Sequence, residues 1–170
     1  MSELLSQPEY LHVLLNPILT HVLPVAAVGL LLSVLFRSPA ATRLGLLLVF
    51  ISAAAVWPTV HYGQAGYDRV VSMADSAGGD WLDIHRHRAE TWAPVFYATA
   101  LVALASLAAS RKWPMKLMQL GWLTTVVAVL ACATALYVAA PAGKIRHREF
   151  RNGAPPADEL QATRQAGEDE

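Results

Sequence analysis

Four long stretches without a charged residue constrain this chain of 170 residues more than any other feature. They cover residues 17–36, 44–62, 92–110 and 117–140, and none of them contains Lys, Arg, Asp or Glu. A helix needs roughly 20 apolar residues to cross the ~30 Å hydrocarbon core of a bilayer, and it satisfies its own backbone hydrogen bonds there. We therefore predict an all-α integral membrane protein, a four-helix bundle that forms one transmembrane domain over residues 1–150.

The basic residues predict how the bundle is oriented. The residues before the first span carry no Lys or Arg. The two short loops between spans carry five of them: Arg37, Arg43, Arg111, Lys112 and Lys116. Short loops rich in Lys and Arg stay in the cytoplasm, so both termini are expected on the outer side. The basic residues of segment 144–151 favour the opposite orientation, which stays open.

Two segments outside the spans also have readable patterns. In the long loop at 63–91, apolar residues at helical spacing predict a short surface helix between spans two and three: Tyr67, Val70, Val71 and Ala74. Gly78-Gly79 is expected to end this helix, and Asp80 to cap the next one, which runs into span three. The tail at 151–170 is rich in Pro, Ala and acidic residues, which predicts disorder.

The chain places its histidines on the side of the membrane away from the short loops. Imidazole is the commonest metal ligand in proteins. His21 lies inside the first span, close behind an Asn16 cap and a Pro17 that are expected to start the helix. Ionisable residues inside spans are costly and suggest a function. His21 is therefore the strongest candidate for a ligand.

The other histidines differ in their expected positions. Three of them should share the membrane level of His21: His61, His85 and His147. His12 is expected to be interfacial only. His85 and His87 are two positions apart, roughly 200° around a helix, so at most one of them faces the bundle, and His87 is expected to face away.

Three interpretations of these histidines remain open. A b-type haem needs two axial imidazoles, for which His21 and His85 are the candidates, and cations near its propionates. Four arginines could supply that charge: Arg86, Arg88, Arg146 and Arg148. Alternatively, His61 and His147 could join the other two around zinc or copper. The third possibility is an accessory subunit of a larger membrane complex, without haem, whose histidines cap helices or hold a structural metal.

Other classes of function find no support in the sequence. It shows no nucleophile–base pair, no phosphate-binding loop and no paired carboxylates within a span, so a catalytic activity is not indicated. Cys132 is the single cysteine, and the absence of a Cys-x-x-Cys-His motif excludes covalently attached c-type haem. The zero net charge says nothing about nucleic acid, and no basic helix with interleaved aromatics suggests it, so no nucleic-acid partner is expected. The expected partners are membrane lipids.

Several short motifs resemble those of a widespread group of small bacterial four-span membrane proteins of uncharacterised function. The segment Asn16-Pro17-Ile18-Leu19-Thr20-His21-Val22-Leu23-Pro24 resembles that group's His-Pro-x-x-Val-His-Phe-Pro opening. Gly63-Gln64-Ala65, Leu82-Asp83-Ile84-His85 and Gly143-Lys144-Ile145-Arg146-His147-Arg148-Glu149 are similar to its later motifs. The resemblance covers about residues 14–150 and implies roles for His21, His85 and His147. It also implies the bacterial inner membrane and a haem or cytochrome partner, so a b-type haem protein serving electron transfer is our first hypothesis.

Overall fold

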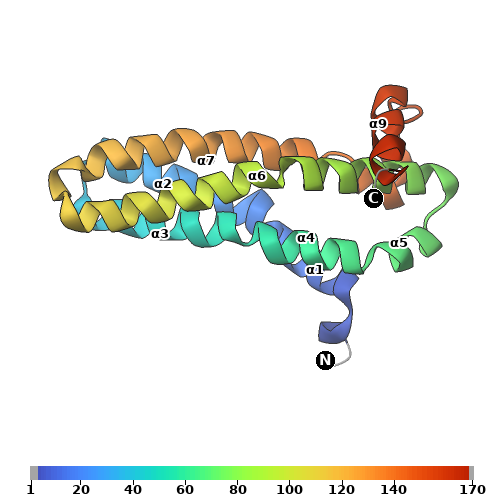
Figure 1. Ribbon diagram of the computed structural model, residues 1–170, viewed down its shortest axis with the longest axis horizontal. Helices are drawn as coiled ribbons and strands as arrows, with labels where there is room; N and C mark the ends of the chain where they lie inside the picture. Colours follow the sequence, from blue (N-terminus) through green and yellow to red (C-terminus); the bar gives the residue numbers. More distant parts are fainter. Residues whose placement is uncertain (1–3, 169–170) are drawn as a thin grey trace.

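Four long helical spans dominate the fold. It is described by a computed structural model that covers residues 4–168. The spans that are long and apolar enough to cross a membrane are Pro8–Leu35, Pro39–Ala65, Ser76–Lys112 and Pro114–Arg146. They form an elongated antiparallel bundle, with both tight turns at one end and α1, α5 and α9 toward the other (Figure 1). The prediction of an all-α four-helix membrane bundle is confirmed.

Three of the four spans are interrupted. The first contains α1 (Pro8–Pro17), the π-helical turn η2 (Ile18–Val22) and α2 (Leu23–Leu35). The second contains α3 (Pro39–Ala54) and α4 (Val56–Ala65), the third is α6 (Ser76–Lys112), and the fourth contains η3 (Pro114–Lys116), α7 (Leu117–Ala139) and α8 (Ala142–Arg146). The shorter elements are η1 (Leu4–Ser6), α5 (Tyr67–Met73), η4 (Arg148–Phe150) and α9 (Ala157–Glu168).

Small residues and hydroxyl groups hold the half of the bundle next to the tight turns. Lipid provides no hydrophobic driving force between helices, so close packing and interhelical hydrogen bonds stabilise such a bundle. Gly121 on α7 is an example, since a Cβ there would lie 2.6 Å from Val34 Cγ2 on α2. The Thr124 hydroxyl donates to Ser106 at 3.1 Å across α6 and α7. This half is closely packed: Leu30, Leu46 and Leu117 are buried in it, and other large apolar side chains face outward, such as Leu101, which is 66% exposed.

The first helix begins earlier than the sequence predicted. It starts at Pro8, with Glu9 in its first turn, and Asn16 and Pro17 lie inside the span rather than at its cap. Pro17 and Pro24 both lack an amide hydrogen, and the wide turn at Ile18–Val22 lies between them. This turn keeps the chain helical across the two prolines, so the span extends well before residue 17.

The loop between spans two and three contains the predicted surface helix, α5 (Tyr67–Met73). The start of α6 differs from the prediction. Asp75, not Asp80, is the N-cap, because its carboxylate accepts the Gly78 amide at 2.8 Å. Gly78 lies inside the first turns of α6, where it lets the C-terminal segment approach closely.

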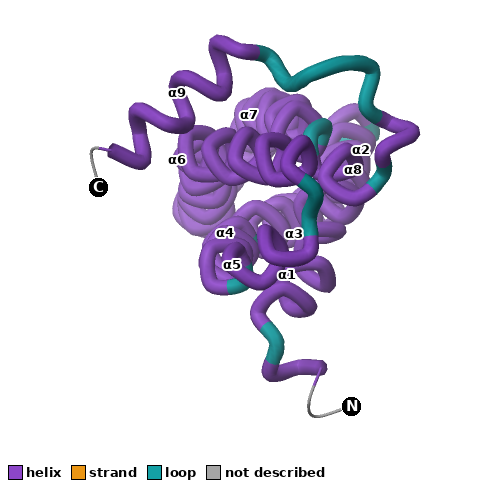
Figure 2. Tube along the Cα trace, turned by 90° about the vertical axis from the view of Figure 1, so that its right-hand side faces the viewer, coloured by secondary structure: helices purple, strands orange, loops and turns teal. Residues whose placement is uncertain are grey.

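The tail at 151–170, predicted to be disordered, contains a helix in its described part. Helix α9 lies beside α6 at the end of the bundle, as Figure 2 shows from that end. Its Glu159 accepts two hydrogen bonds from Arg88 on α6, each 2.7 Å long. Composition alone suggested a solvated tail, but α9 is held by this long-range pair and by the packing of Leu160 against a small buried cluster that contains Trp81 and Ile145.

Candidate functional site

The bundle opens into a cavity at the end away from the tight turns. Its volume is about 680 Å³, within the range of about 300–1,000 Å³ that small-molecule sites occupy. The walls come from α1, η2, α4, α5, α6, α7 and α8, and most of the lining is apolar, with Leu19, Val60 and Phe96 among its residues. Counting from Lys112 at about 1.5 Å per residue, His85 lies roughly 40 Å along α6. Because the hydrocarbon core is ~30 Å thick, the cavity opens at the membrane surface.

His12 enters this cavity from α1. The sequence predicted an interfacial residue without a role, yet the ring is half-buried against α4. Its Nδ1 lies 2.8 Å from the backbone carbonyl oxygen of Thr59. A histidine that holds a metal usually gives its second ring nitrogen to such a carbonyl, which fixes the orientation of the ring. The environment of His12 is therefore that of an oriented ligand.

His85 faces His12 from α6 and is buried, with 9% of its surface exposed. Its Nδ1 lies 2.8 Å from the carbonyl oxygen of Val138, near the C-terminal end of α7. The last carbonyls of a helix have no amide donor within the helix. Pro141, which lacks an N–H, leaves the Tyr137 carbonyl open as well, and Arg88 donates to it at 2.8 Å. One face of α6 thus caps the end of α7 and orients His85.

The imidazoles of His12 and His85 have their ring centroids 6.1 Å apart and their planes at 77°. Because a carbonyl oxygen only accepts hydrogen bonds, each Nδ1 carries a hydrogen, and in a neutral imidazole the lone pair is then on Nε2. No described residue forms a hydrogen bond with either Nε2. Two metal–nitrogen bonds of about 2.0–2.1 Å, plus roughly 1 Å from each nitrogen to its ring centre, put the centroids of trans imidazoles roughly 6 Å apart. The observed separation fits two ligands of one metal ion.

His21, the strongest candidate from the sequence, is placed differently. It lies on η2 and lines the cavity, but its side chain is exposed and its Nδ1 is 2.8 Å from the Thr20 hydroxyl. The structure shows no ring contact between His21 and His85, in contrast to the His12–His85 pair. His21 therefore contributes to the wall, deeper in the membrane than His12, and His12 is the better partner for His85.

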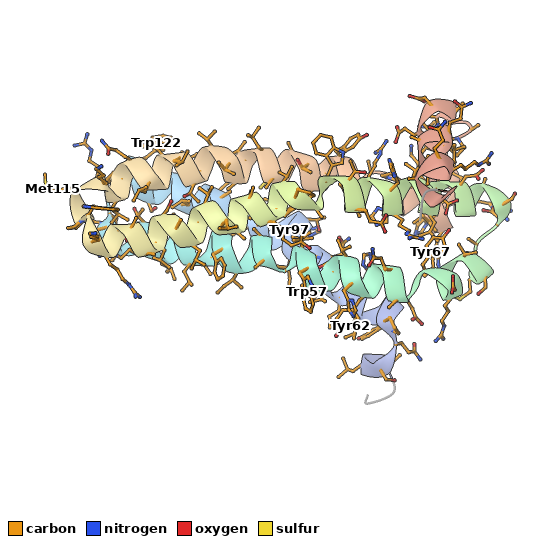
Figure 3. All side chains as sticks on the ribbon, in the orientation of Figure 1. Trp57, Tyr62, Tyr67, Tyr97, Met115 and Trp122 are labelled. Carbon is orange, nitrogen blue, oxygen red and sulfur yellow. The ribbon has the colours of Figure 1, made fainter. Side chains whose placement is uncertain are left out.

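The other predicted histidines lie outside the cavity lining. His61 is exposed and stacks on Trp57, with centroids 5.7 Å apart and planes at 6°. Trp57 and Tyr62 lie on the outer side of α4 (Figure 3). His147 is exposed too, and its Nδ1 lies 2.9 Å from the Glu149 carboxylate. The structure thus brings His85 and His21 to one cavity but does not place His61 or His147 there.

Two of the four predicted arginines line the cavity. Arg86 forms an ion pair with Glu90 at 2.9 Å and lies over the ring of Tyr67, whereas Arg146 is exposed and has its Nη2 3.8 Å from Met73 Sδ. The other two are engaged elsewhere: Arg88 with Glu159 and Tyr137, and Arg148 with Asp75. Arg146 and the Arg86–Glu90 ion pair therefore line the cavity.

A polar network surrounds Arg86 on the cavity wall. The Tyr67 hydroxyl donates to the Asp83 carboxylate, and Gln64 donates to Glu90 at 3.0 Å. Partial burial, followed by the hydrogen bond and the negative charge of Asp83, raises the pKa of Tyr67 to about 12. Tyr67 therefore stays a neutral hydrogen-bond donor over the physiological range.

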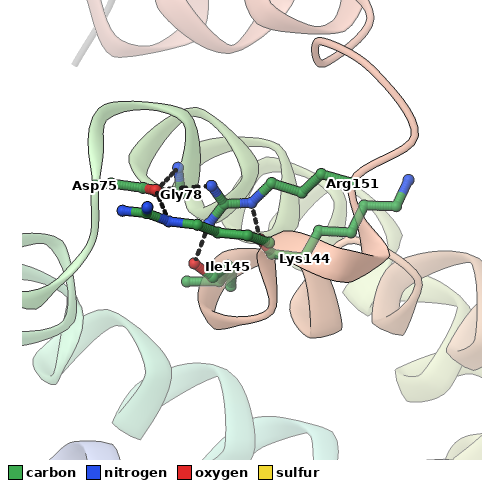
Figure 4. Close-up of polar contacts among 6 residues, drawn as sticks. Asp75, Gly78, Lys144, Ile145 and Arg151 are labelled. Carbon is green, nitrogen blue, oxygen red and sulfur yellow. Dashed lines mark hydrogen bonds and ion pairs between the residues drawn. The ribbon is translucent and has the colours of Figure 1, made fainter.

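A cluster around Arg151 fixes the α8 wall of the cavity (Figure 4). Arg151 donates to the carbonyl oxygens of Lys144 at 2.6 Å and Ile145 at 2.7 Å, and it pairs with Asp75 at 2.9 Å. The hydrogen bonds from Arg151 and from the Gly78 amide lower the pKa of Asp75 to about 2. At Gly78, a Cβ would lie 2.6 Å from the Ile145 carbonyl oxygen. This clasp, defined as Asp75, Gly78 and Arg151 with the two carbonyls, joins α8 to the start of α6.

The sequence did contain a signal for the position of His12 at the cavity. Pro8 followed by Glu9 is typical of a helix start, and a helix from Pro8 places His12 on the same span as His21. The apolar run from residue 17 outweighed that signal. The carbonyl to which His12 is hydrogen-bonded, that of Thr59, has no recognisable signal in the sequence.

Comparison with known proteins adds no relative. No family model, curated protein or solved structure matches this chain. The resemblance to the small four-span membrane proteins therefore stays a prediction, and the proposals below depend on the geometry of the cavity.

Proposed function

We propose that the cavity binds one b-type haem, with His12 and His85 as axial ligands, and that the protein serves electron transfer at the membrane surface. One observation carries this proposal: two imidazoles from different helices, each oriented by a backbone carbonyl, have their centroids 6.1 Å apart beside an apolar cavity. Axial histidines whose second nitrogen is hydrogen-bonded are typical of protein haem sites.

The donor set favours haem over a bare zinc or copper ion. Protein sites for these metals use three or four side-chain ligands. Within residues 4–168, no group of three or more His, Cys, Asp or Glu side chains is placed to hold a metal. A macrocycle supplies the four remaining donors itself, so two imidazoles are sufficient for it.

The rest of the cavity suits the two ends of such a ligand. The apolar side chains of α4, α6 and α7 would cover the ring, and Arg146, which lines the cavity, would offer charge to its carboxylates. When bound, haem would supply one-electron chemistry. His12 and His85 would hold its metal, and the carbonyls of Thr59 and Val138 would keep their rings in place.

The same proposal includes the orientation of the chain. The five basic residues of the short loops favour the cytoplasm for the tight turns. The cavity would then open on the outer face of a bacterial inner membrane, where a cytochrome or another subunit of a larger membrane complex could exchange electrons with it.

The test is an absorption spectrum of protein produced with ample haem. The purified protein should show a Soret band with sharp low-spin bands after reduction. His12→Ala and His85→Ala should each lose the low-spin spectrum, whereas His61→Ala and His147→Ala, both outside the cavity lining, should keep it. A wild-type protein without Soret absorbance contradicts the proposal and favours an accessory subunit without haem.

A further inference from the structure

Helix α1 packs against two glycines: Gly63 in α4, which faces a side chain, and Gly66 directly after α4, which faces the backbone. A Cβ on Gly63 would lie 2.8 Å from His12 Nδ1 and 3.1 Å from its Cε1. A Cβ on Gly66 would lie 2.8 Å from the backbone nitrogen of Glu9. Both distances are too short for real carbon contacts, so the close approach of α1 depends on these residues having no side chain.

Gly63 also exposes the carbonyl to which His12 donates. In an α-helix the carbonyl of residue i points toward residue i+4, and for Thr59 that residue is Gly63. A side chain at position 63 would cover the Thr59 oxygen from the direction of α1. The Thr59 hydroxyl does not compete for this site, because it donates to the Ala55 carbonyl at 2.8 Å. The oxygen is therefore open to the imidazole, which reaches it at 2.8 Å.

The two imidazoles obtain their carbonyl partners in different ways. His85 uses Val138, near a helix end where carbonyls lack amide donors. His12 uses a carbonyl in the middle of α4, which a side chain at the next turn would cover. Of the two imidazoles, His12 is thus the one whose orientation a single methyl group added at position 63 can change.

We infer that Gly63 is a positioning residue for the His12 imidazole: it leaves room for the ring and opens the Thr59 carbonyl that orients it. The contact itself does not require a cofactor. Its consequence for a metal ligand rests on the proposed function. If the orientation of a ligand depends on its hydrogen-bond partner, removal of that partner typically costs about 10- to 100-fold in metal affinity.

Haem-free protein tests the contact without reference to haem. The experiment is a double-mutant cycle on thermal unfolding in detergent, with Gly63→Ala, His12→Ala and their combination. Gly63→Ala alone should lower the unfolding midpoint, and His12→Ala should relieve most of that loss, because the ring that the methyl group strikes is gone. Gly66→Ala is the matched contrast, since it meets the backbone of α1 and His12→Ala should not relieve it. If the effects of Gly63→Ala and His12→Ala on the unfolding midpoint are additive, the inference is overturned. This holds even if Gly63→Ala is strongly destabilised.

The haem-loaded protein tests the positioning role. Gly63→Ala should weaken haem binding about 10- to 100-fold and reduce the low-spin fraction of the spectrum. Gly29→Ala, at a position with no heavy atom within 4 Å of the added Cβ, should leave both unchanged. If the wild type binds haem and Gly63→Ala has the same affinity and spectrum, the inference about Gly63 is overturned while the proposed function stands. Absence of haem from the wild type overturns the proposed function, while the unfolding cycle still decides the contact.

Discussion

The two ends of this bundle use the same four spans in opposite ways. Next to the tight turns, Gly121 and the Thr124–Ser106 hydrogen bond draw α2, α6 and α7 together, and the polar groups serve packing. At the other end the helices diverge around a cavity lined by His12 and His85, whose Nε2 atoms form no hydrogen bond with any residue of segment 4–168. The difference separates a closely packed half from a half that encloses a cavity.

Overpacking the closed half should have the largest effect on stability. Gly121→Val would push a side chain into Val34 and the Thr42 methyl, at Cβ distances of 2.6 and 3.0 Å. Overpacking of a closely packed core costs about 1–3 kcal/mol. The unfolding midpoint in detergent should fall clearly, whereas Gly29→Val, on the open surface of α2, serves as the control and should change it little. Equal midpoints for the two variants would show that this half is not closely packed.

Loss of the Arg151 clasp should loosen the cavity end and spare the closed half. Arg151→Ala removes the donors to the Lys144 and Ile145 carbonyls and the partner of Asp75. Hydrogen bonds to charged groups are stronger than neutral ones, so local opening of α8 should increase about tenfold or more. Amide hydrogen exchange in detergent measures this, with the amides of α3 as the internal reference. Uniform acceleration along all helices would contradict a division into two halves.

The α9 contact should have the smallest effect. Glu159→Gln weakens the pair with Arg88, whose side chain is 12% exposed and which keeps its bond to the Tyr137 carbonyl. We expect a loss of about 1 kcal/mol or less, seen as a decrease of about 2–4 °C or less in the unfolding midpoint. Glu149→Gln, in the exposed pair with His147, is the control. If deletion of residues 157–170 changes nothing, α9 contributes nothing to the fold.

The fold could largely be predicted from the sequence, since charge-free stretches and helical spacing carry the four spans and α5. The start of the first span could not be predicted, because the apolar, charge-free stretch begins only at residue 17. The π turn at Ile18–Val22 also lies between two prolines, and hydropathy does not predict such a turn. Each extra residue in a turn rotates the preceding helix by roughly 100°. The direction of His12 on α1 therefore cannot be extrapolated from the apolar face of α2.

The site was predictable only in part, for a similar reason. His85 and His21 both line the cavity, as their positions near span ends suggested. Which imidazole meets His85 depends on how closely α1 packs on α4, which Gly63 and Gly66 set through contacts distant in sequence. The same applies to α9, whose order depends on a pair between Arg88 and Glu159.

The measurement that tests the central claim most directly is chemical rescue of the ligand pair. His12→Gly and His21→Gly are produced with haem, and their absorption spectra are recorded before and after addition of free imidazole. If His12 pairs with His85, His12→Gly should be high-spin and imidazole should restore the low-spin spectrum, while His21→Gly should be low-spin throughout. A low-spin His12→Gly together with a high-spin His21→Gly that imidazole rescues would contradict the assignment and identify His21 as the ligand.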